Sequence, residues 1–388
     1  MRQIRNTSDV LRRVQFAALG PNLRPGDQLR YRAAAPVPAV RLETTGALAR
    51  ARRHAIPSTF WPAWTARLLP RQERYPAVRG PALAASLLLA GTRLTHAEAA
   101  RLLGDVISHW TVTTTLQRLH ATPQWSDICT ALTALAGHLD TQPAVIDYER
   151  RRHLDYTSLL PDAEWEDIRL RTERADHVQM SRRLAPYARH VLFTRLSGLP
   201  FTRTPFSRSR NDRNFKNGLA AFITALTPEL AAELTRVAEE FLARHQIRDE
   251  PTVWQPPAKI LDGLDLPGLD LASLDLDEIH KLVRTDGASA AAIARRSGTT
   301  SDAIRALLLD HPAPADPASG ARRRRARYTI SREQLWDLHH GQRLSFAEIG
   351  QRTGYSRTAI TDLARVYEIP MSIYRDGKQL KAPADVEG

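Results

Sequence analysis

The chain has 388 residues, of which 43% are apolar, and a formal net charge of +13. This length and apolar content predict two or three globular domains joined by disordered segments. The single cysteine, Cys129, excludes an internal disulfide and any cysteine-rich zinc site.

Nearly all of the positive charge is arginine, because the chain has only five lysines. Arginine binds phosphate oxygens and guanine edges through its planar fork, so nucleic acid is the partner class that the charge favours. A GC-rich genome would explain arginine over lysine but not the excess over acidic residues. The longest apolar run, Leu83 to Gly91, is too short to span a bilayer. We therefore expect a cytoplasmic, nucleoid-associated protein without a membrane partner.

Residues 1–45 are rich in proline and predict an extended, partly disordered N-terminal segment. Residues 46–140 then show helical periodicity and predict a helical domain. Within it, Thr95, Ala100 and Gly104 fit a helix-turn-helix start, but the next predicted helix, 111–119, begins later than that pattern allows. An ordinary helical hairpin is the favoured interpretation, with a variant helix-turn-helix as the alternative.

Residues 141–248 predict a second helical domain that contains a group of acidic residues. Surface ion pairs with the many nearby arginines are the favoured interpretation of this group, and a metal-dependent nuclease or recombinase site is the alternative. The acidic residues are Asp147, Glu149, Asp155, Asp162, Glu164, Glu166 and Asp167.

A basic stretch in the same domain is interleaved with two phenylalanines, Phe206 and Phe215. Arg208, Arg210 and Arg213 are its candidate nucleic-acid contacts, because cations around aromatic rings bind phosphate and stack on unpaired bases. A solvated loop whose phenylalanines enter the core is an equally good interpretation.

The remainder of the chain alternates linkers and short helices. Residues 249–273 combine prolines with a Leu-Asp alternation and predict a linker and domain boundary. A helix-turn-helix unit is expected at 274–311, a basic Pro/Ala/Arg linker at 312–329, a second helix-turn-helix unit at 330–372 and a tail at 373–388. The predicted fold class is all-α, with a helical N-terminal body followed by two tandem tri-helical helix-turn-helix units.

The second unit satisfies the positional demands of a helix-turn-helix. Gly350 is small where two helices cross, and Gly354 can adopt the positive φ of the turn. Ile360 and Leu363 are apolar where the second helix must be held on the first. Ser345 precedes the first of these helices, and Ser356 precedes the second as its N-cap.

An upstream copy repeats this pattern at a constant offset of 56 residues. Ala294 and Gly298 correspond to Gly350 and Gly354, and the apolar pair Ile304 and Leu307 corresponds to Ile360 and Leu363. The preceding helices and the N-caps follow the same offset. A repeated unit is a stronger indication than one match, because four-position matches occur by chance in helical proteins.

The exposed face of the last helix predicts the base contacts, and the flanking basic segment predicts phosphate or minor-groove contacts. The upstream copy is less suited to base recognition, because Asp302 would repel phosphate. We expect it to position the protein on DNA more than to determine the sequence that is bound. The predicted contacts are Ser356, Arg357, Thr358, Thr361 and Arg365 in the second unit, Thr300, Ser301 and Arg305 in the first, and Arg322, Arg323, Arg324, Arg325 and Arg327 in the linker.

The tail "LSFAEIGQRTGYSRTAITDLARVYEIP" resembles the end of many bacterial helix-turn-helix proteins. The layout of "STFWPAWTARLLP", "HLDYTSLLP", "DEPTVWQPP" and two such units resembles actinobacterial TniQ-like proteins, which are helical DNA-binding accessories of transposons. The cysteine-rich zinc knuckles usual in that family are missing. The chain therefore corresponds either to the part after that module or to another family.

These features favour a non-catalytic protein that binds specific sequences of double-stranded DNA through its tandem helix-turn-helix units. We expect it to act as a transcriptional regulator or as a targeting accessory of a mobile element, with transcription or transposition proteins as partners and with no cofactor or metal. A catalytic recombinase or nuclease with its active site in residues 140–250 is one alternative. A helical scaffold that binds only proteins is the other.

Overall fold

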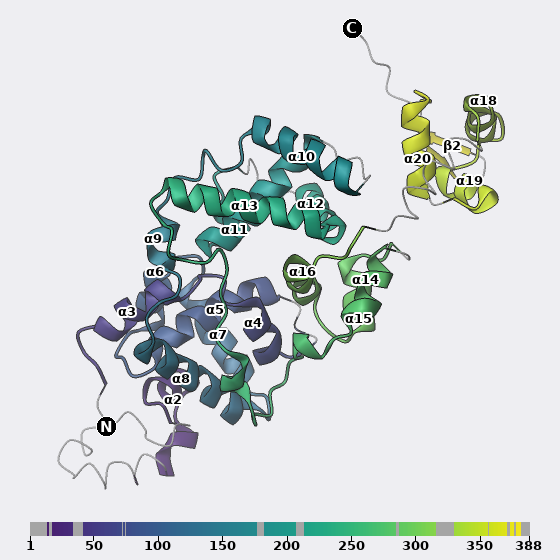
Figure 1. Ribbon diagram of the computed structural model, residues 1–388. Coiled ribbons are helices and arrows are strands. Elements are labelled where there is room, and N and C mark those ends of the chain that lie inside the picture. Colours follow the sequence, from purple (N-terminus) through teal and green to yellow (C-terminus); the bar gives the residue numbers. More distant parts are fainter. Residues whose placement is uncertain are drawn as a thin grey trace. The chain divides into compact units, whose positions relative to one another are not determined.

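The computed structural model describes residues 14, 18–33, 42–71, 73, 75–176, 182–206, 213–284, 287–315, 330–355, 357–370, 373–375 and 378–381 (Figure 1). The fold is all-α, as expected, and one short pair of strands follows the last helix. The chain divides into two compact units. One, called the body below, comprises residues 1–172 and 180–314, and the other, called the C-terminal unit, comprises residues 315–388 together with 173–179.

The first half of the body is built around one apolar helix, α5 (Pro76–Leu89), whose residues from Arg79 to Leu89 are all buried. A helix that is apolar on every side must be covered on every side, and α5 contacts each of the longer helices around it. These surrounding elements are η2 (Gly20–Asn22), α2 (Pro25–Arg30), α3 (Ala47–Ala55), α4 (Pro62–Leu68), α6 (His96–Leu102), α7 (His109–His120) and α8 (Trp125–Thr141).

The second half of the body shares another apolar cluster, which extends from Tyr156 to Ala313. Its residues come from helices that the sequence assigns to a helical domain and to the upstream helix-turn-helix unit. Its elements are α9 (Tyr148–Arg152), α10 (Asp162–Asp176), η3 (Arg182–Leu184), α11 (Ala185–Ser197), η4 (Phe201–Arg203), α12 (Arg213–Ala225), α13 (Pro228–Arg244), α14 (Leu276–Arg284), α15 (Ala290–Arg296) and α16 (Ser301–Asp310).

The segment 249–273, predicted as a linker between domains, is packed on the body. Leu261, Leu266 and Leu269 of this segment are buried, and two short turns, η5 (Ala258–Leu261) and η6 (Leu271–Ser273), interrupt it. The backbone N–H groups of Gly268 and Leu269 donate to the carbonyl oxygens of Arg67 (3.1 Å) and Ala66 (3.0 Å). The boundary between the two units therefore lies beyond Pro314 instead of at this segment.

Part of the N-terminal segment also differs from its prediction as extended chain. Helix α2 contacts α5 and α7, and Leu29 is fully buried. The indole N–H of Trp125 donates to Oε1 of Gln28 at 2.8 Å. Pro25 occupies the first turn of α2, where a proline favours a helix start, so the prolines here do not exclude helix.

Three described arginines of the body, Arg52, Arg79 and Arg151, are buried, although composition alone suggests that arginine is surface charge. Arg52 is 1% exposed and donates from Nε and from one terminal nitrogen to Asp140, at 2.6 and 2.7 Å. Arg151 is fully buried and donates to Glu250 at 2.8 Å. A buried guanidinium requires such a partner, so part of the arginine content stabilises the fold.

The C-terminal unit contains α18 (Arg332–Trp336), a single π-helical turn η7 (Asp337–Gly341), α19 (Phe346–Thr353) and α20 (Arg357–Val366). A short antiparallel pair, β1 (Ile373–Arg375) and β2 (Lys378–Lys381), follows, in part of what was predicted as a tail. Across the described residues of both units, none of the helices has the length and apolar content needed to cross a membrane.

Candidate nucleic-acid interface

The helices of the C-terminal unit begin where the sequence places hydroxyl side chains. Ser331 and Ser345 each accept a hydrogen bond from the backbone N–H three residues later, and Gln334 and Glu348 bond back to the cap N–H. These reciprocal bonds satisfy N–H groups that the first turn of a helix leaves unpaired. The starts of α18 and α19 are thus fixed by local chemistry.

The corner between α19 and α20 is formed by two glycines with different roles. Gly350 is buried within α19, so the absence of a side chain there lets other groups pack closely. Gly354 ends α19 with φ +75°, in the left-handed region that L-residues rarely adopt. Together they permit a sharp turn into α20.

Helix α20 is held by one apolar face. Ile360 is fully buried, Leu363 is 2% exposed and Ala364 is fully buried, and all three belong to a cluster with Leu335 and Ile349. The chain after α20 is also attached to this unit: the hydroxyl of Tyr367 donates to the carbonyl of Ile330 at 3.0 Å. This packing fixes which face of α20 remains on the surface.

The surface face of α20 carries three of the residues predicted to contact DNA. Arg357 and Arg365 are exposed and Thr361 is half-buried. The hydroxyl of Thr361 donates to the carbonyl of Arg357 at 2.9 Å. The guanidinium of Arg357 has no ion pair or hydrogen bond with any residue in the described ranges. Ser356 and the side chain of Thr358 lie outside what the structure describes.

In the body, α14, α15 and α16 repeat the same local features 56 residues earlier. Ala294 is buried like Gly350, and Gly298 has φ +63°, close to the value at Gly354. Ile304 is fully buried and Leu307 is 6% exposed. Ser289 and Thr300 cap their helices through hydrogen bonds to the backbone three residues later. Among the described residues, the sequence repeat therefore corresponds to a repeat of the first cap, the turn and the core positions.

Helix α16 differs from α20 in what covers it. It contacts α4 and α12 of the body, and every residue from Ser301 to Leu309 is buried or half-buried. Of the three contacts predicted here, Thr300 is used as a cap, Ser301 is half-buried, and Arg305 forms an ion pair with Asp302. Within the body α16 is a packing helix that lacks the open face seen on α20.

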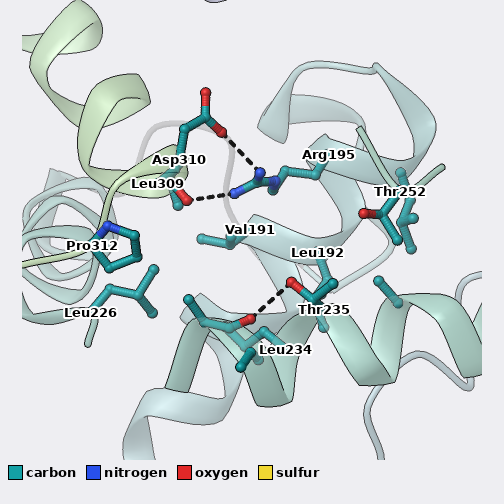
Figure 2. A pocket seen from close by; sticks show the side chains of 14 residues that line it. Val191, Leu192, Arg195, Leu226, Leu234, Thr235, Thr252, Leu309, Asp310 and Pro312 are labelled. Carbon is teal, nitrogen blue, oxygen red and sulfur yellow. Dashed lines mark hydrogen bonds and ion pairs between the residues drawn. The ribbon is translucent and has the colours of Figure 1, made fainter. Parts of the chain in front are cut away.

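The end of α16 is also tied to α11, as Figure 2 shows. Arg195 donates to the carbonyl oxygen of Leu309 and to the carboxylate of Asp310, both at 2.9 Å. Beside these contacts is a small pocket of about 180 Å³ with mainly apolar lining, including Val191 and Leu234. These bonds fix α16 to the helical layer of α11 and α13.

The remaining basic candidates are only partly placed. The five arginines of the linker, Arg208 and Arg210 lie outside the described residues, and Arg213 begins α12 without a described side chain. The two phenylalanines of the same stretch are placed: Phe206 packs against the body's apolar cluster, and the ring of Phe215 lies 4.4 Å from that of His190. Both rings contact other side chains of the body, and Phe215 belongs to α12 and not to a loop.

The acidic residues of 141–248 are mostly engaged with cations or backbone N–H groups. Glu149 pairs with Arg53 and Arg152, Glu164 with Arg236, Glu166 with Arg169, and Asp162 with Arg189. Asp147 accepts from the N–H of Arg150, and Asp155 accepts from Thr157. In the described ranges, no three His, Cys, Asp or Glu residues are grouped to hold a metal ion.

A surface that the sequence did not single out lies on α7. Trp110, in its first turn, is 66% exposed, the largest exposed fraction among the described large hydrophobic residues. Helix α7 begins at His109, two residues earlier than predicted, because Ser108 caps it. The spacing from this cap to buried Val112 equals that from Ser356 to Ile360. This equal spacing is the sequence pattern from which the start of α7 could have been predicted.

Comparisons with protein-family models, with curated proteins and with solved structures give no match to this chain.

Proposed function

We propose that this protein binds specific sequences of double-stranded DNA through the C-terminal unit, with α19 and α20 as a helix-turn-helix and α20 in the major groove. The proposal is supported first by the outer face of α20. Arg357 and Arg365 lie two turns apart on a helix whose opposite face is fixed by Ile360 and Leu363. A rigid helix with exposed arginine is the element that reads base edges in this class of protein.

Arg357 is the single residue on which the proposal chiefly depends. It is in the first turn of α20, the part of a recognition helix that reaches furthest into the groove. It is exposed and makes no ion pair within the described part of the chain, so its guanidinium is free to donate two parallel hydrogen bonds to guanine. In this proposal Thr361, one turn later on the same face, contacts the neighbouring base or its methyl group.

The rest of the chain supplies attachment and charge in this proposal. The basic segment containing Arg322 to Arg325 and Arg327 precedes the reading unit, where it would neutralise phosphates or enter the minor groove. Helix α16 belongs to the scaffold, because the body covers it. The net charge of +13 adds a sequence-independent attraction to any duplex.

The biological role that fits these properties is that of a transcriptional regulator or of a targeting accessory for a mobile element. Both roles need sequence recognition without chemistry on the DNA, together with a large body for protein partners. The resemblance of the chain's layout to TniQ-like accessories favours the second role. The partners would then be transposition proteins, and in the first role they would be transcription proteins.

The test is selection of bound duplexes from a random library by the full chain, followed by the same selection with Arg357→Ala. An enriched sequence and salt-dependent affinity are expected for the wild type. The variant should lose preference at one base position, by a factor corresponding to about 1–3 kcal/mol, while other positions keep theirs. Arg295→Ala, at an exposed arginine of α15, is the matched control and should leave the preference unchanged.

Two outcomes would count against the proposal. Absence of any enriched sequence together with salt-independent binding would leave a protein-binding scaffold as the function. Uniform weakening of all duplexes by Arg357→Ala would assign this arginine to phosphate instead of to a base.

A further inference from the structure

The three helices α5, α6 and α7 of the body share the local pattern of the two repeated groups. Thr95 caps α6 with a capping box to Glu98, as Ser345 caps α19. Ala100 lies five residues after this cap and is 3% exposed, and Gly104 lies four residues further with φ +85°. Ser289, Ala294 and Gly298 have the same spacing in the other group of the body.

The helix before the cap also matches. Leu335 and Leu338 precede Ser345 by ten and seven residues, and Ala85 and Leu88 precede Thr95 by the same distances. Both Ala85 and Leu88 are fully buried. All three helices contact one another, so they form a closed three-helix group and not only a hairpin.

One difference separates this group from the others, and it is confined to the turn. The cap of α7, Ser108, lies four residues after Gly104, whereas Thr300 lies two residues after Gly298. Beyond the cap the register is restored, because Val112 is fully buried four residues after Ser108, as Ile304 is after Thr300. The turn is therefore two residues longer, and the helix that follows presents equivalent faces.

The outer positions of α7 can now be identified from those of α20. His109, Thr113 and Gln117 stand at the same distances from their cap as Arg357, Thr361 and Arg365. His109 and Gln117 are exposed, and the next outer positions carry exposed Trp110 and exposed Arg118. Every one of these side chains can donate a hydrogen bond, and none is a carboxylate. The covered helix α16 has no comparable surface.

Basic side chains and one carboxylate, that of Asp27, line a cleft of about 730 Å³ that borders this face of α7. Arg24, His96 and His109 line it, together with Arg30, which forms an ion pair with Asp27 at 2.6 Å. Glu98, an acid of the same region, is held in its capping box. Arg24 is exposed at this cleft and can contact a backbone phosphate.

We propose that the outer face of α7 is a second site for double-stranded DNA, with His109, Trp110 and Gln117 toward the bases and Arg24 toward a phosphate. The inference rests on the proposed function and deepens it. The protein would read two segments of one target, one through α7 in the body and one through α20 in the C-terminal unit. A surface indole at such a position would contact the thymine methyl or sugar edge through its apolar ring.

The experiment uses the full chain and the duplexes selected by the wild type. Trp110→Ala and Gln117→Ala should each lower affinity for these duplexes about tenfold and remove base preference in one segment of the site. In both variants, the segment of the target at which Arg357→Ala relaxes the base preference should keep its wild-type preference. Arg24→Ala should instead weaken all duplexes alike and reduce the slope of log affinity against log salt by about 1.

Leu170→Ala is the control, because Leu170 is a 40% exposed apolar residue on α10. It should leave affinity and preference at wild-type values. Trp110 and Gln117 are both exposed, so their variants are expected to fold, and unchanged unfolding midpoints would establish this.

The result that overturns the inference is wild-type affinity and wild-type base preference in both Trp110→Ala and Gln117→Ala, which would show that the outer face of α7 does not contact DNA. In that case the C-terminal unit would still select DNA, and Arg357→Ala would still relax the base preference of that selection. Failure of the proposed function itself looks different, because no duplex would then be enriched by the wild type.

Discussion

Arg195 on α11 donates to the carboxylate of Asp310 at 2.9 Å and so fixes the last turn of α16 to the body. The same guanidinium donates to the carbonyl of Leu309, one of those that a helix C-terminus leaves unpaired. In the sequence repeat, α16 corresponds to the recognition helix. In the body, however, it packs against α4 and α12. The two copies therefore differ in their surroundings, because α16 is packed into the body whereas α20 keeps an exposed face.

Arg195→Ala is expected to destabilise the body by about 1 kcal/mol, because both side chains are partly exposed and water screens the pair. Its effect on the base preference of the protein should be nil, since α16 is a packing helix. Urea unfolding, followed by the methyl NMR signals of Ile304, would measure the loss of stability. Duplex selection would measure the base preference. A relaxed base preference in this variant would show that α16 takes part in reading.

The repeat was predictable because its information is local. Caps, the turn glycine and the apolar positions all lie within about 30 residues of each other, and hydrogen bonds three or four residues apart determine them. The sequence could not reveal that α4, more than 200 residues earlier, covers α16. Contacts over such distances depend on the fold and leave no periodicity in either segment.

The packing of the 249–273 segment was also not predictable from the sequence. Its Leu-Asp alternation and prolines are typical of a linker, but Leu261 and Leu266 belong to an apolar cluster of the body, and Leu269 is buried as well. The buried arginines Arg52 and Arg151 were likewise invisible in composition, where every arginine counts as charge. Whether an apolar or basic residue is on the surface is decided by what packs over it.

Gly268→Ala is expected to destabilise the body by about 3 kcal/mol through overpacking. A Cβ at this position would lie 1.9 Å from the carbonyl oxygen of Ala66, which is backbone and cannot move aside alone. Gly137→Ala is the matched control, because nothing lies within 4 Å of its Cβ and it is inside α8. That change should stabilise the protein by up to about 1 kcal/mol. Equal midpoints for the two variants in urea would refute the packing of 249–273 on the body.

Gly354→Ala is expected to destabilise the C-terminal unit by about 1–2 kcal/mol, because a Cβ is unfavourable at φ +75°. The cost is conformational only, since no atom lies within 4 Å of the added Cβ. Gly354→Asn should cost less, because asparagine tolerates the left-handed region better. Gly298→Ala, at φ +63°, makes the same change in the body and should leave the C-terminal unit unaffected. Methyl NMR of Ile360 during urea titration would follow the unit; an unchanged midpoint for Gly354→Ala would contradict the turn geometry.

His339 predicts a pH dependence for the stability of the C-terminal unit. Burial lowers the pKa of this imidazole below its usual value, with a smaller opposing effect from its hydrogen bond to the carbonyl of Leu344. The folded state therefore favours the neutral ring, and its contribution is complete above the unfolded pKa of about 6.5. As pH falls from there toward the lowered folded pKa, the unfolded chain binds the proton first and stability decreases.

His339→Phe should remove this part of the pH dependence, because phenylalanine does not titrate and its ring can keep the stacking on Phe346, whose centroid is 4.3 Å away. The measurement is the urea midpoint of the C-terminal unit in the full chain at pH 7.5, 6.5 and 5.5, followed by the methyl signals of Leu335 and Ile360. The wild-type midpoint should fall between pH 6.5 and 5.5 more steeply than that of the variant. Parallel curves would mean that another group causes the decrease, and that the neutral ring of His339 is not required for packing of the unit.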